Sequence, residues 1–219
     1  MRSGDPSKAL ILANLDRAAA FGTGSGKIAG NYCSTLVPSL FAKKAGYTIL
    51  LFLDSVLHQF VEEFSTSNFI ALYTDSETGQ KVYVTPKSGS ILDSVTNRSL
   101  YEIAERKLGW KCERRPIKWD EIRSGKFQEI AAVGTAVVLT PVGTIDRQIV
   151  KNDVDIGNEM FEILSGEKED PREIEIESVK LTGDSSGVME LYKAIRECQR
   201  GDDEDMVKNW GWMWPLDGI

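Results

Sequence analysis

The chain has 219 residues, 42% of them hydrophobic and 27% charged, and a formal net charge of -7. This composition is ordinary for a globular protein, and the length permits a buried core in one large domain or two small ones. The acidic balance argues against binding to nucleic acid, which needs clustered lysine and arginine. No apolar run in the sequence approaches the roughly 18 residues needed to span a membrane.

The three cysteines, Cys33, Cys112 and Cys198, are odd in number and widely spaced. They suggest neither a disulfide framework nor a metal site, and we expect no bound metal. The start of the chain holds only a short apolar run, too short for a secretory signal. We therefore expect a soluble protein in the cytoplasm or the mitochondrion.

Short β-branched runs alternate with amphipathic stretches, which predicts an α/β or α+β fold with a substantial sheet. In chain order we expect a helix at 34–45, strands at 48–53, 69–73 and 81–84, a helix at 97–108, a strand at 111–115, a helix at 119–125, a strand at 137–142 and a helix at 187–199. Gly46, Gly109 and Gly201 follow three of the helical stretches, where a left-handed residue often ends a helix.

Two segments of the second half are unusual. Residues 146–185 are polar, and the Glu-Ile alternation at 173–177 predicts a surface excursion with one edge strand. Near the C-terminus, Trp210, Trp212 and Trp214 follow one another closely. Large aromatic side chains are rarely left in water, so we expect this tail to dock on the body or on a partner subunit.

A glycine-rich loop at 17–32 contains a single lysine, Lys27. Its four glycines let the backbone bend sharply and approach a ligand closely. A lysine held at a pocket can form an imine and exchange protons. Two other interpretations stay open. One is a flexible surface turn with a solvated lysine, and the other is a phosphate-binding loop, although Ile28 stands where that motif requires serine or threonine.

Several further segments, in the same order, resemble the branched-chain amino-acid aminotransferases, which are pyridoxal 5'-phosphate (PLP) enzymes of fold type IV. The matching segments are R-A at 17–18, K-I-A-G-N-Y at 27–32, A-x-x-x-G-Y at 42–47, L-F-L-D at 51–54, E-F-S-T-S-N-F at 63–69, V-T-P at 84–86, G-S-I-L at 89–92, G-T-A at 134–136, P-V at 141–142, C-Q-R-G at 198–201 and W-M-W-P at 212–215.

This resemblance implies the large domain of fold type IV, in which a sheet curls into a distorted barrel surrounded by helices. Residues 1–219 would form that single PLP-binding domain, with 146–185 as a diverged excursion. Family members carry a small α/β domain ahead of the segment that matches residue 8 onward, and we expect it to be absent here. The resemblance also implies a homodimer that binds an amino acid and a 2-oxo acid, with neither nucleic acid nor membrane as a partner.

The resemblance gives three residues a role at the reacting end of the cofactor. Lys27 would bind PLP covalently and move a proton between the substrate α-carbon and the cofactor. Glu63 would face the pyridine nitrogen and keep it protonated; the alternative is a surface carboxylate beside Glu62. Tyr32 would bind near the phenolic oxygen of PLP and help to wall the substrate side chain.

Phosphate binding is expected at the start of the helix near residue 95. The resemblance assigns it to the backbone N–H groups of Val95 and Thr96, to the hydroxyls of Thr96 and Thr135, and to Arg17. For the two threonines the alternative is an ordinary helix N-cap or a strand-end hydroxyl.

The substrate would be held on the other side of the cofactor. The amides of Thr135 and Ala136 would meet its carboxylate, while Tyr32, Thr66 and Ala136 would line its pocket. The resemblance thus assigns the same turn, at 134–136, to both cofactor and substrate.

The sequence departs from the family pattern at three positions near the cofactor. Ser65 replaces a glycine, while Asp93 and Ser94 replace a proline and a glycine. Serine has less backbone freedom than glycine, and a carboxylate near the phosphate would repel it. We therefore expect PLP to be bound less tightly than the lysine alone implies.

The implied reaction transfers the amino group of a branched-chain or other hydrophobic L-amino acid to 2-oxoglutarate, giving the 2-oxo acid and glutamate. Three alternatives stay open. The chain could be a truncated or inactive relative that keeps the fold and dimer contacts, or an aminotransferase with an altered substrate in specialised metabolism. It could also perform another fold type IV reaction, such as that of 4-amino-4-deoxychorismate lyase or of D-amino-acid aminotransferases.

Overall fold

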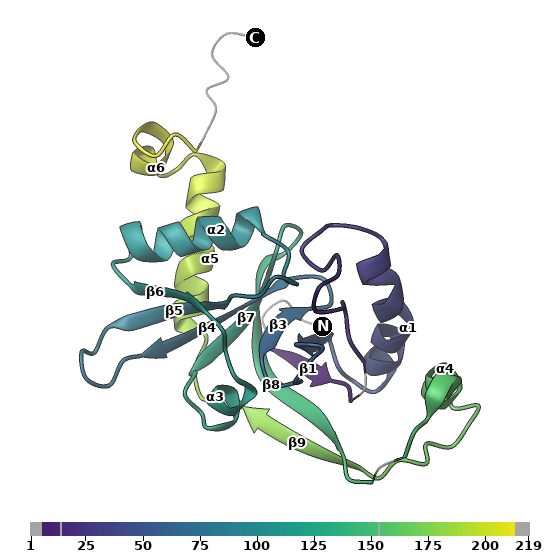
Figure 1. Cartoon of the computed structure of the whole chain (residues 1–219). Helices are drawn as coiled ribbons and strands as arrows, with labels where there is room; N and C mark the ends of the chain where they lie inside the picture. The colour runs from purple at the N-terminus through teal and green to yellow at the C-terminus, as the bar shows by residue number, and fades with distance from the viewer. Residues whose placement is uncertain (1–5, 14, 153, 213–219) are drawn as a thin grey trace.

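The computed structural model describes residues 6–13, 15–152 and 154–212 (Figure 1). In chain order its elements are β1 (Ser7–Ile11), α1 (Gly30–Lys44), β2 (Ile49–Leu53), β3 (Val61–Phe64), β4 (Asn68–Thr74), β5 (Lys81–Pro86), α2 (Val95–Glu102), the π-helical turn η1 (Ile103–Lys107), β6 (Lys111–Arg115), α3 (Trp119–Arg123), β7 (Glu129–Gly134), β8 (Val138–Val150), the short helix η2 (Gly157–Glu159), α4 (Met160–Ser165), β9 (Ile174–Lys180), α5 (Ser186–Arg200) and α6 (Glu204–Lys208).

The strands form one sheet that closes into a barrel. Its order is β3-β2-β1-β8-β7-β4, and β3 pairs back with β4 to close the ring. The closing pair is Glu63 opposite Asn68. Outside the ring, β5 and β6 extend the sheet from β4, and β9 pairs with β8. The expected barrel-like sheet with surrounding helices is confirmed.

Strands β2, β3, β4 and β7 of the barrel are buried on both faces over most of their length. Along β4, Phe69 and Ala71 belong to the cluster inside the barrel, whereas Ile70 and Leu72 pack outward against the cluster beneath α2 and α5. These helices cover one side of the sheet, and α1 lies on the other side of the barrel (Figure 1). Burial on both faces explains why the strand reads as a continuous apolar run.

Every predicted helix and strand has an observed counterpart. The strand expected at 111–115 has the bounds of β6, whereas the strand expected at 137–142 continues to Val150 as β8. The helix expected at 97–108 begins earlier, at Val95, because Ser94 caps it, and it ends in the π-helical turn η1. Strands β1, β3 and β7 were not predicted.

The glycine prediction at the helix ends is confirmed. Gly46, Gly109 and Gly201 have φ angles of +91°, +68° and +75°. In this left-handed region a side chain is disfavoured, so glycine ends each helical stretch at little cost.

The polar excursion begins later than expected, because 146–150 belong to β8 and Asp146 is buried. Asp146 accepts hydrogen bonds from Tyr47 at 2.8 Å and Ser178 at 2.6 Å, and Lys8 lies 2.7 Å away. The expected edge strand is confirmed as β9, which pairs only with β8 in the described sheet. The Glu-Ile alternation therefore belongs to a true strand.

The part of the tryptophan tail that the structure describes docks on the body. Trp210 and Trp212 pack against the cluster beneath α5, and their rings meet edge to face with centroids 5.2 Å apart. The guanidinium of Arg106 lies 3.8 Å from the Trp210 ring centroid, an arrangement in which the cation is attracted to the face of the ring. Trp214 lies outside the described residues.

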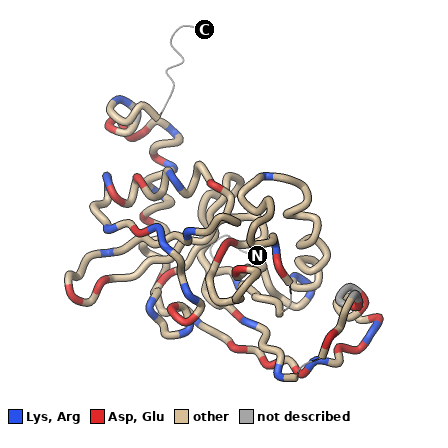
Figure 2. Tube along the Cα trace, viewed as in Figure 1, with Lys and Arg blue, Asp and Glu red and all other residues tan. Residues whose placement is uncertain are grey.

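Charged residues of both signs are interspersed over most of the chain, whereas α1 carries charge only at its end, at Lys43 and Lys44 (Figure 2). Within the described residues, no helix is long and apolar enough to cross a bilayer. All three cysteines have free thiols.

Candidate active site

The loop between β1 and α1 places Lys27, which is exposed, at the N-terminal end of the helix. Asn31, buried in the first turn of α1, donates from Nδ2 to the carbonyl oxygens of Thr23 at 2.8 Å and Gly26 at 2.9 Å. A buried amide that satisfies two loop carbonyls ties the loop to the helix. The loop is thereby held in one shape, which disfavours its interpretation as a flexible surface turn.

The same loop packs closely on the turn that contains Ser90. A Cβ added at Gly24 would lie 2.5 Å from the Ser90 carbonyl oxygen, so this approach requires glycine. Arg17 strengthens the contact, since its Nη2 donates to the carbonyl of Gly24 at 3.2 Å and also to that of Ser90. The glycine-rich composition therefore serves close packing here.

Glu63 lies near the end of β3 and is buried, so its interpretation as a surface carboxylate is wrong. The Nη2 atom of Arg17 is 3.0 Å from its Oε1. Asn68, which faces Glu63 across the β3–β4 pair, donates from Nδ2 to Oε2 at 2.7 Å. The carboxylate is thus held from two sides, and Arg17, expected at the phosphate, pairs with Glu63 instead in this structure.

The neighbouring carboxylate, Glu62, is also buried and accepts a hydrogen bond from the Ser88 hydroxyl at 2.7 Å. Burial raises the pKa of both carboxyl groups. That of Glu63 rises to about 7, because loss of water outweighs the opposing effects of Arg17 and Asn68. Glu63 therefore titrates near neutral pH and can hold or release a proton there.

This raised pKa predicts a pH dependence of stability. Unfolded Glu63 would ionise near 4.5 and folded Glu63 near 7, so between these values the folded state binds more protons. Stability contributed by this group is therefore present below the lower value and lost as pH rises through 7, by about 3 kcal/mol in all. Urea unfolding of the wild type and of Glu63→Gln at several pH values would show it: the variant should lack this fall. Parallel pH profiles would contradict the prediction.

Six of the predicted residues line one hollow at the mouth of the barrel: Arg17, Lys27, Tyr32, Glu63, Thr66 and Thr135. They come from the β1–α1 loop, the first turn of α1, strand β3, the β3–β4 turn and the β7–β8 turn. Segments far apart in the sequence thus converge on a polar pocket that joins a guanidinium, an amine, a phenol, a carboxylate and two hydroxyls.

A second hollow, of about 230 Å³, adjoins the first and shares Thr66 and Thr135 with it. Ala136 lines only this second hollow, together with apolar side chains such as Ile49 and Val138. Val138 has a φ angle of +66°, a conformation that costs a β-branched residue free energy and that clusters at functional turns. The β7–β8 turn is therefore held in a strained shape between the two hollows.

The start of α2 lies beside the first hollow. Ser94, which lines it, caps the helix by accepting from the Asn97 N–H at 3.2 Å. The interpretation of Thr96 as the N-cap is therefore wrong. Val95 and Thr96 themselves are not among the lining residues, but their N–H groups lie in the first helical turn, where no intrahelical acceptor is available. These donors suit an anion that sits next to Ser94.

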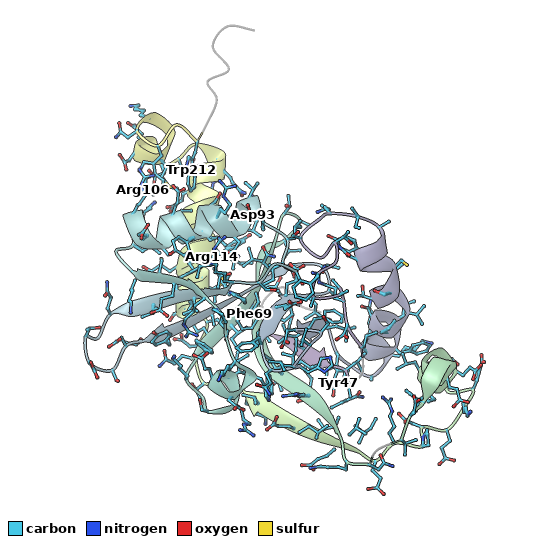
Figure 3. All side chains as sticks on the ribbon, viewed as in Figure 1. Tyr47, Phe69, Asp93, Arg106, Arg114 and Trp212 are labelled. Atoms are coloured by element: carbon cyan, nitrogen blue, oxygen red, sulfur yellow. The ribbon has the colours of Figure 1, made fainter. Side chains whose placement is uncertain are left out.

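Asp93 is better neutralised than its position suggests. Its carboxylate is exposed and lies 3.6 Å from Arg98 and 3.9 Å from Arg114 (Figure 3). Two nearby cations offset its charge, so the repulsion expected at the phosphate is reduced.

The donor set fits PLP. Lys27 offers an amine for its aldehyde, Glu63 a carboxyl group for its ring nitrogen, and the start of α2 offers N–H groups for its phosphate. The buried atoms Arg17 Nε and Asn68 Oδ1 have no hydrogen-bond partner within the described part of the chain, which leaves polar capacity beside Glu63 for a bound group. Among those same residues, no three His, Cys, Asp or Glu side chains gather as a metal site.

Sequence reasoning missed several residues of this site. Asn68 and Asn31 lie within the quoted motifs but received no role, and Ser94 was noted only as a departure. The signal for Asn68 was its position: a tight turn at 65–67 between two strands places it opposite Glu63. For Asn31 no local signal existed, since its partners become visible only in the folded loop.

Comparisons with known proteins agree with this geometry. The family model for amino-transferase class IV matches residues 2–145. Aminotransferase atnJ of Emericella nidulans is 43% identical over 145 residues, which are 65% of this chain and 41% of that protein. The branched-chain amino acid aminotransferase gloG of Glarea lozoyensis is 34% identical over 202 residues, 91% of this chain and 49% of that protein. The chain spans about half the length of these curated relatives or less.

Solved structures show the same architecture. A branched-chain amino acid aminotransferase from T.th., solved with pyridoxamine 5'-phosphate, is similar with a TM-score of 0.53 at 26% identity, over 64% of this chain and 43% of that one. The family resemblance and the fold inferred from it are confirmed. The chain belongs to the class IV aminotransferases.

Proposed function

We propose that this chain forms the PLP-binding part of an aminotransferase that moves the amino group of a branched-chain or other hydrophobic L-amino acid to 2-oxoglutarate. The observation that carries the proposal is the convergence of Lys27, Tyr32 and Glu63 on one hollow, with Glu63 buried against Arg17. Catalysis of this kind needs an amine and a carboxyl group in fixed relation, which the loop and the strand provide.

Each residue has a part that follows from its surroundings. PLP, when bound, supplies an aldehyde carbon for the amino group and a ring that accepts the electron pair of the substrate's α C–H bond. Lys27 would take the proton from the substrate α-carbon and deliver it to the cofactor carbon that carries the nitrogen. Glu63, held by Arg17 and Asn68, keeps a proton on the ring nitrogen, and its pKa of about 7 suits such sharing.

The second hollow supports a hydrophobic substrate. Its wall includes Ile49, Val137 and Val138, and it opens directly beside Thr135 and Ala136. The amides of that turn would hold the substrate carboxylate while an aliphatic side chain lies against the valines. One of the two curated relatives above is named a branched-chain amino acid aminotransferase, which agrees with this choice.

Assembly as a homodimer is part of the proposal. Helix α1 leaves Leu36, Val37 and Leu40 exposed, an uncharged stripe at helical spacing that a second copy would cover. The proposal also takes residues 1–219 as a single PLP-binding domain of a protein whose relatives are about twice as long.

The proposal predicts transamination by the chain supplied with PLP. Glutamate should form from 2-oxoglutarate and leucine, isoleucine or valine, and more slowly from aspartate, since the second hollow has apolar walls. A coupled assay for glutamate measures the rate, and a reaction mixture without an added amino-acid substrate is the control. Equal rates with aspartate and leucine would contradict the assigned side-chain preference.

A second candidate is an inactive relative that keeps the fold. The first hollow encloses only about 50 Å³ and opens to its surroundings, which favours weak cofactor binding. Normal folding without PLP binding at millimolar cofactor would support this candidate against the first. Transamination with a different amino acid would instead indicate an altered substrate.

A further inference from the structure

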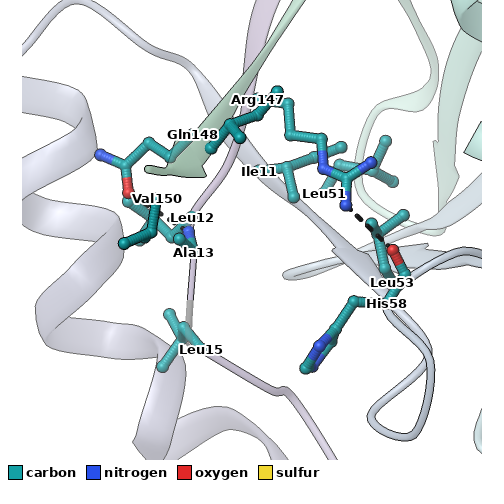
Figure 4. Close-up of a pocket in the computed structure, with 11 residues that line it drawn as sticks. Ile11, Leu12, Ala13, Leu15, Leu51, Leu53, His58, Arg147, Gln148 and Val150 are labelled. Carbon is teal, nitrogen blue, oxygen red and sulfur yellow. Dashed lines mark hydrogen bonds between the residues drawn. The ribbon is translucent and has the colours of Figure 1, made fainter. Parts of the chain in front are cut away.

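Another cavity, of about 190 Å³, lies away from the candidate active site (Figure 4). It is bounded by the end of β1 and the residues after it, by β2 with the loop that follows, and by the second half of β8. It shares no lining residue with either hollow described above. Its occupant, if any, would therefore bind without contacting Lys27 or Thr135.

The walls of this cavity combine aliphatic side chains with polar groups, among them Arg147, Gln148 and His58. The apolar side chains that line it include Ile11, Leu12, Leu15, Leu51, Leu53 and Val150. Three of them, Ile11, Leu51 and Leu53, belong to the cluster inside the barrel, so the floor of the cavity is continuous with the core. A fixed apolar floor favours an apolar ligand over bulk water.

The cation at the rim is Arg147 on β8, which is half-buried and lies across the cavity from Leu15 (Figure 4). Its Nη2 donates to the His58 carbonyl oxygen at 3.0 Å. Within the described residues, no carboxylate lies within 4.0 Å of its guanidinium. Partly buried charges are usually paired, and this one retains donors for an anion.

Glu177 and Asp120 are the carboxylates whose charge acts on Arg147, and both have other partners. Glu177 accepts from the indole N–H of Trp119 at 2.8 Å and lies 3.8 Å from Arg123, and Asp120 lies 2.9 Å from Arg123. Their charge is thus shared with a second arginine. In the part of the chain that the structure describes, Arg147 therefore has no carboxylate of its own, and its guanidinium lies 5.6 Å from the centroid of the Trp119 ring.

The rest of the rim is polar and ordered. The Gln148 side-chain oxygen accepts from the Ala13 N–H at 3.2 Å, and His58 lies 2.9 Å from Asp16. His58 has a φ angle of +50°, a conformation that is uncommon outside glycine. These contacts fix the opening between Leu15 and His58 (Figure 4).

We propose that this cavity is a binding site for a short aliphatic monocarboxylate, with its alkyl chain on the leucine floor and its carboxylate on Arg147. The size agrees, because a cavity of about 150 Å³ accepts benzene, so about 190 Å³ suits a ligand of roughly six to eight non-hydrogen atoms. The planar guanidinium matches a carboxylate better than it matches an alcohol or an amide. The proposal stands independently of transamination.

The test is methyl NMR of the full chain, with leucine and valine methyl groups labelled and 4-methylpentanoate as the probe. Binding with a Kd of about a millimolar should shift the methyl signals of Leu15, Leu53 and Val150. The neutral 4-methylpentanamide should bind about tenfold or more weakly, because it cannot accept a charge-assisted pair of hydrogen bonds.

Two variants locate the site. Arg147→Met, which keeps a long apolar stem, should weaken the binding of 4-methylpentanoate about tenfold or more while the remaining spectrum stays folded. Lys27→Ala should leave these shifts unchanged. If Arg147→Met unfolds the chain, Leu15→Phe, which fills the opening without altering charge, should also weaken binding. Shifts confined to Val133, Val137 and Val138, equal binding of acid and amide, or no shift at all would overturn the proposal.

Discussion

Replacing Lys27 with alanine is expected to reduce transamination by about a thousandfold or more, since the residue both binds the cofactor covalently and carries the proton. Reduction with borohydride followed by peptide mass spectrometry should place a pyridoxyl group on Lys27 in the wild type and on no lysine in the variant. The exposed end of Lys27 has no role in the core, so its removal should leave the free energy of unfolding nearly unchanged.

Lys43→Ala is the matched control, because Lys43 is exposed in the last turn of the same helix that follows Lys27. Its activity and its pyridoxyl labelling at Lys27 should equal those of the wild type. Labelling at another lysine with activity retained in Lys27→Ala would show that the anchor has been assigned wrongly.

Replacing Arg17 with methionine is expected to destabilise the fold by about 3 kcal/mol near pH 8, because a buried carboxylate then loses the cation that lies 3.0 Å from it. At about pH 5 the loss should be smaller, since Glu63 then carries a proton and needs no cation. Urea unfolding at the two pH values measures the difference. Loss of the bonds from Arg17 to the Gly24 and Ser90 carbonyls contributes at both.

Two further variants test whether charge pairing causes this loss of stability. Adding Glu63→Gln to Arg17→Met should restore stability near pH 8 but not near pH 5, because only the ionised carboxylate needs the arginine. Arg98→Met, at an exposed arginine that lies 3.6 Å from Asp93, should change stability by no more than about 0.5 kcal/mol. An equal cost of Arg17→Met at both pH values would show that charge pairing is not the cause.

Local patterns predicted the elements that have a continuous apolar run, a regular apolar repeat or sharp boundaries. Helix α5 could be predicted because Val188, Leu191 and Ile195 repeat at helical spacing and all three are buried. Strand β6 lies between Gly109 and Pro116, which delimit it. Strand β3 was missed because its two central residues are glutamates, which normally indicate surface. Their burial depends on Arg17 and Ser88, which lie far away in the sequence.

The positions of the site were predicted better than its contacts. Lys27, Tyr32, Glu63, Thr66 and Thr135 were assigned through ordered motifs, and the structure gathers them in one hollow. The pairing of Arg17 with Glu63 had no sequence signal, because all of α1 and β2 lie between the two residues, which meet only when the barrel closes. The positive φ angle of Val138 could not be predicted from the residue type either, because it depends on the conformation of the β7–β8 turn.

The pair of Glu63 with Asn68 also joins β3 to β4 and so closes the ring of strands. A closed ring of strands has no edge strand, so opening it requires breaking the hydrogen bonds between two neighbouring strands. We expect the pair of strands with the fewest paired residues to separate first. The carboxyl group assigned to the cofactor therefore belongs to the strand pairing that closes the barrel. We expect amide hydrogens around the β3–β4 pairing to exchange earlier than those along β7 and β8. Cofactor binding should slow this exchange, because the ligand would stabilise the closed barrel.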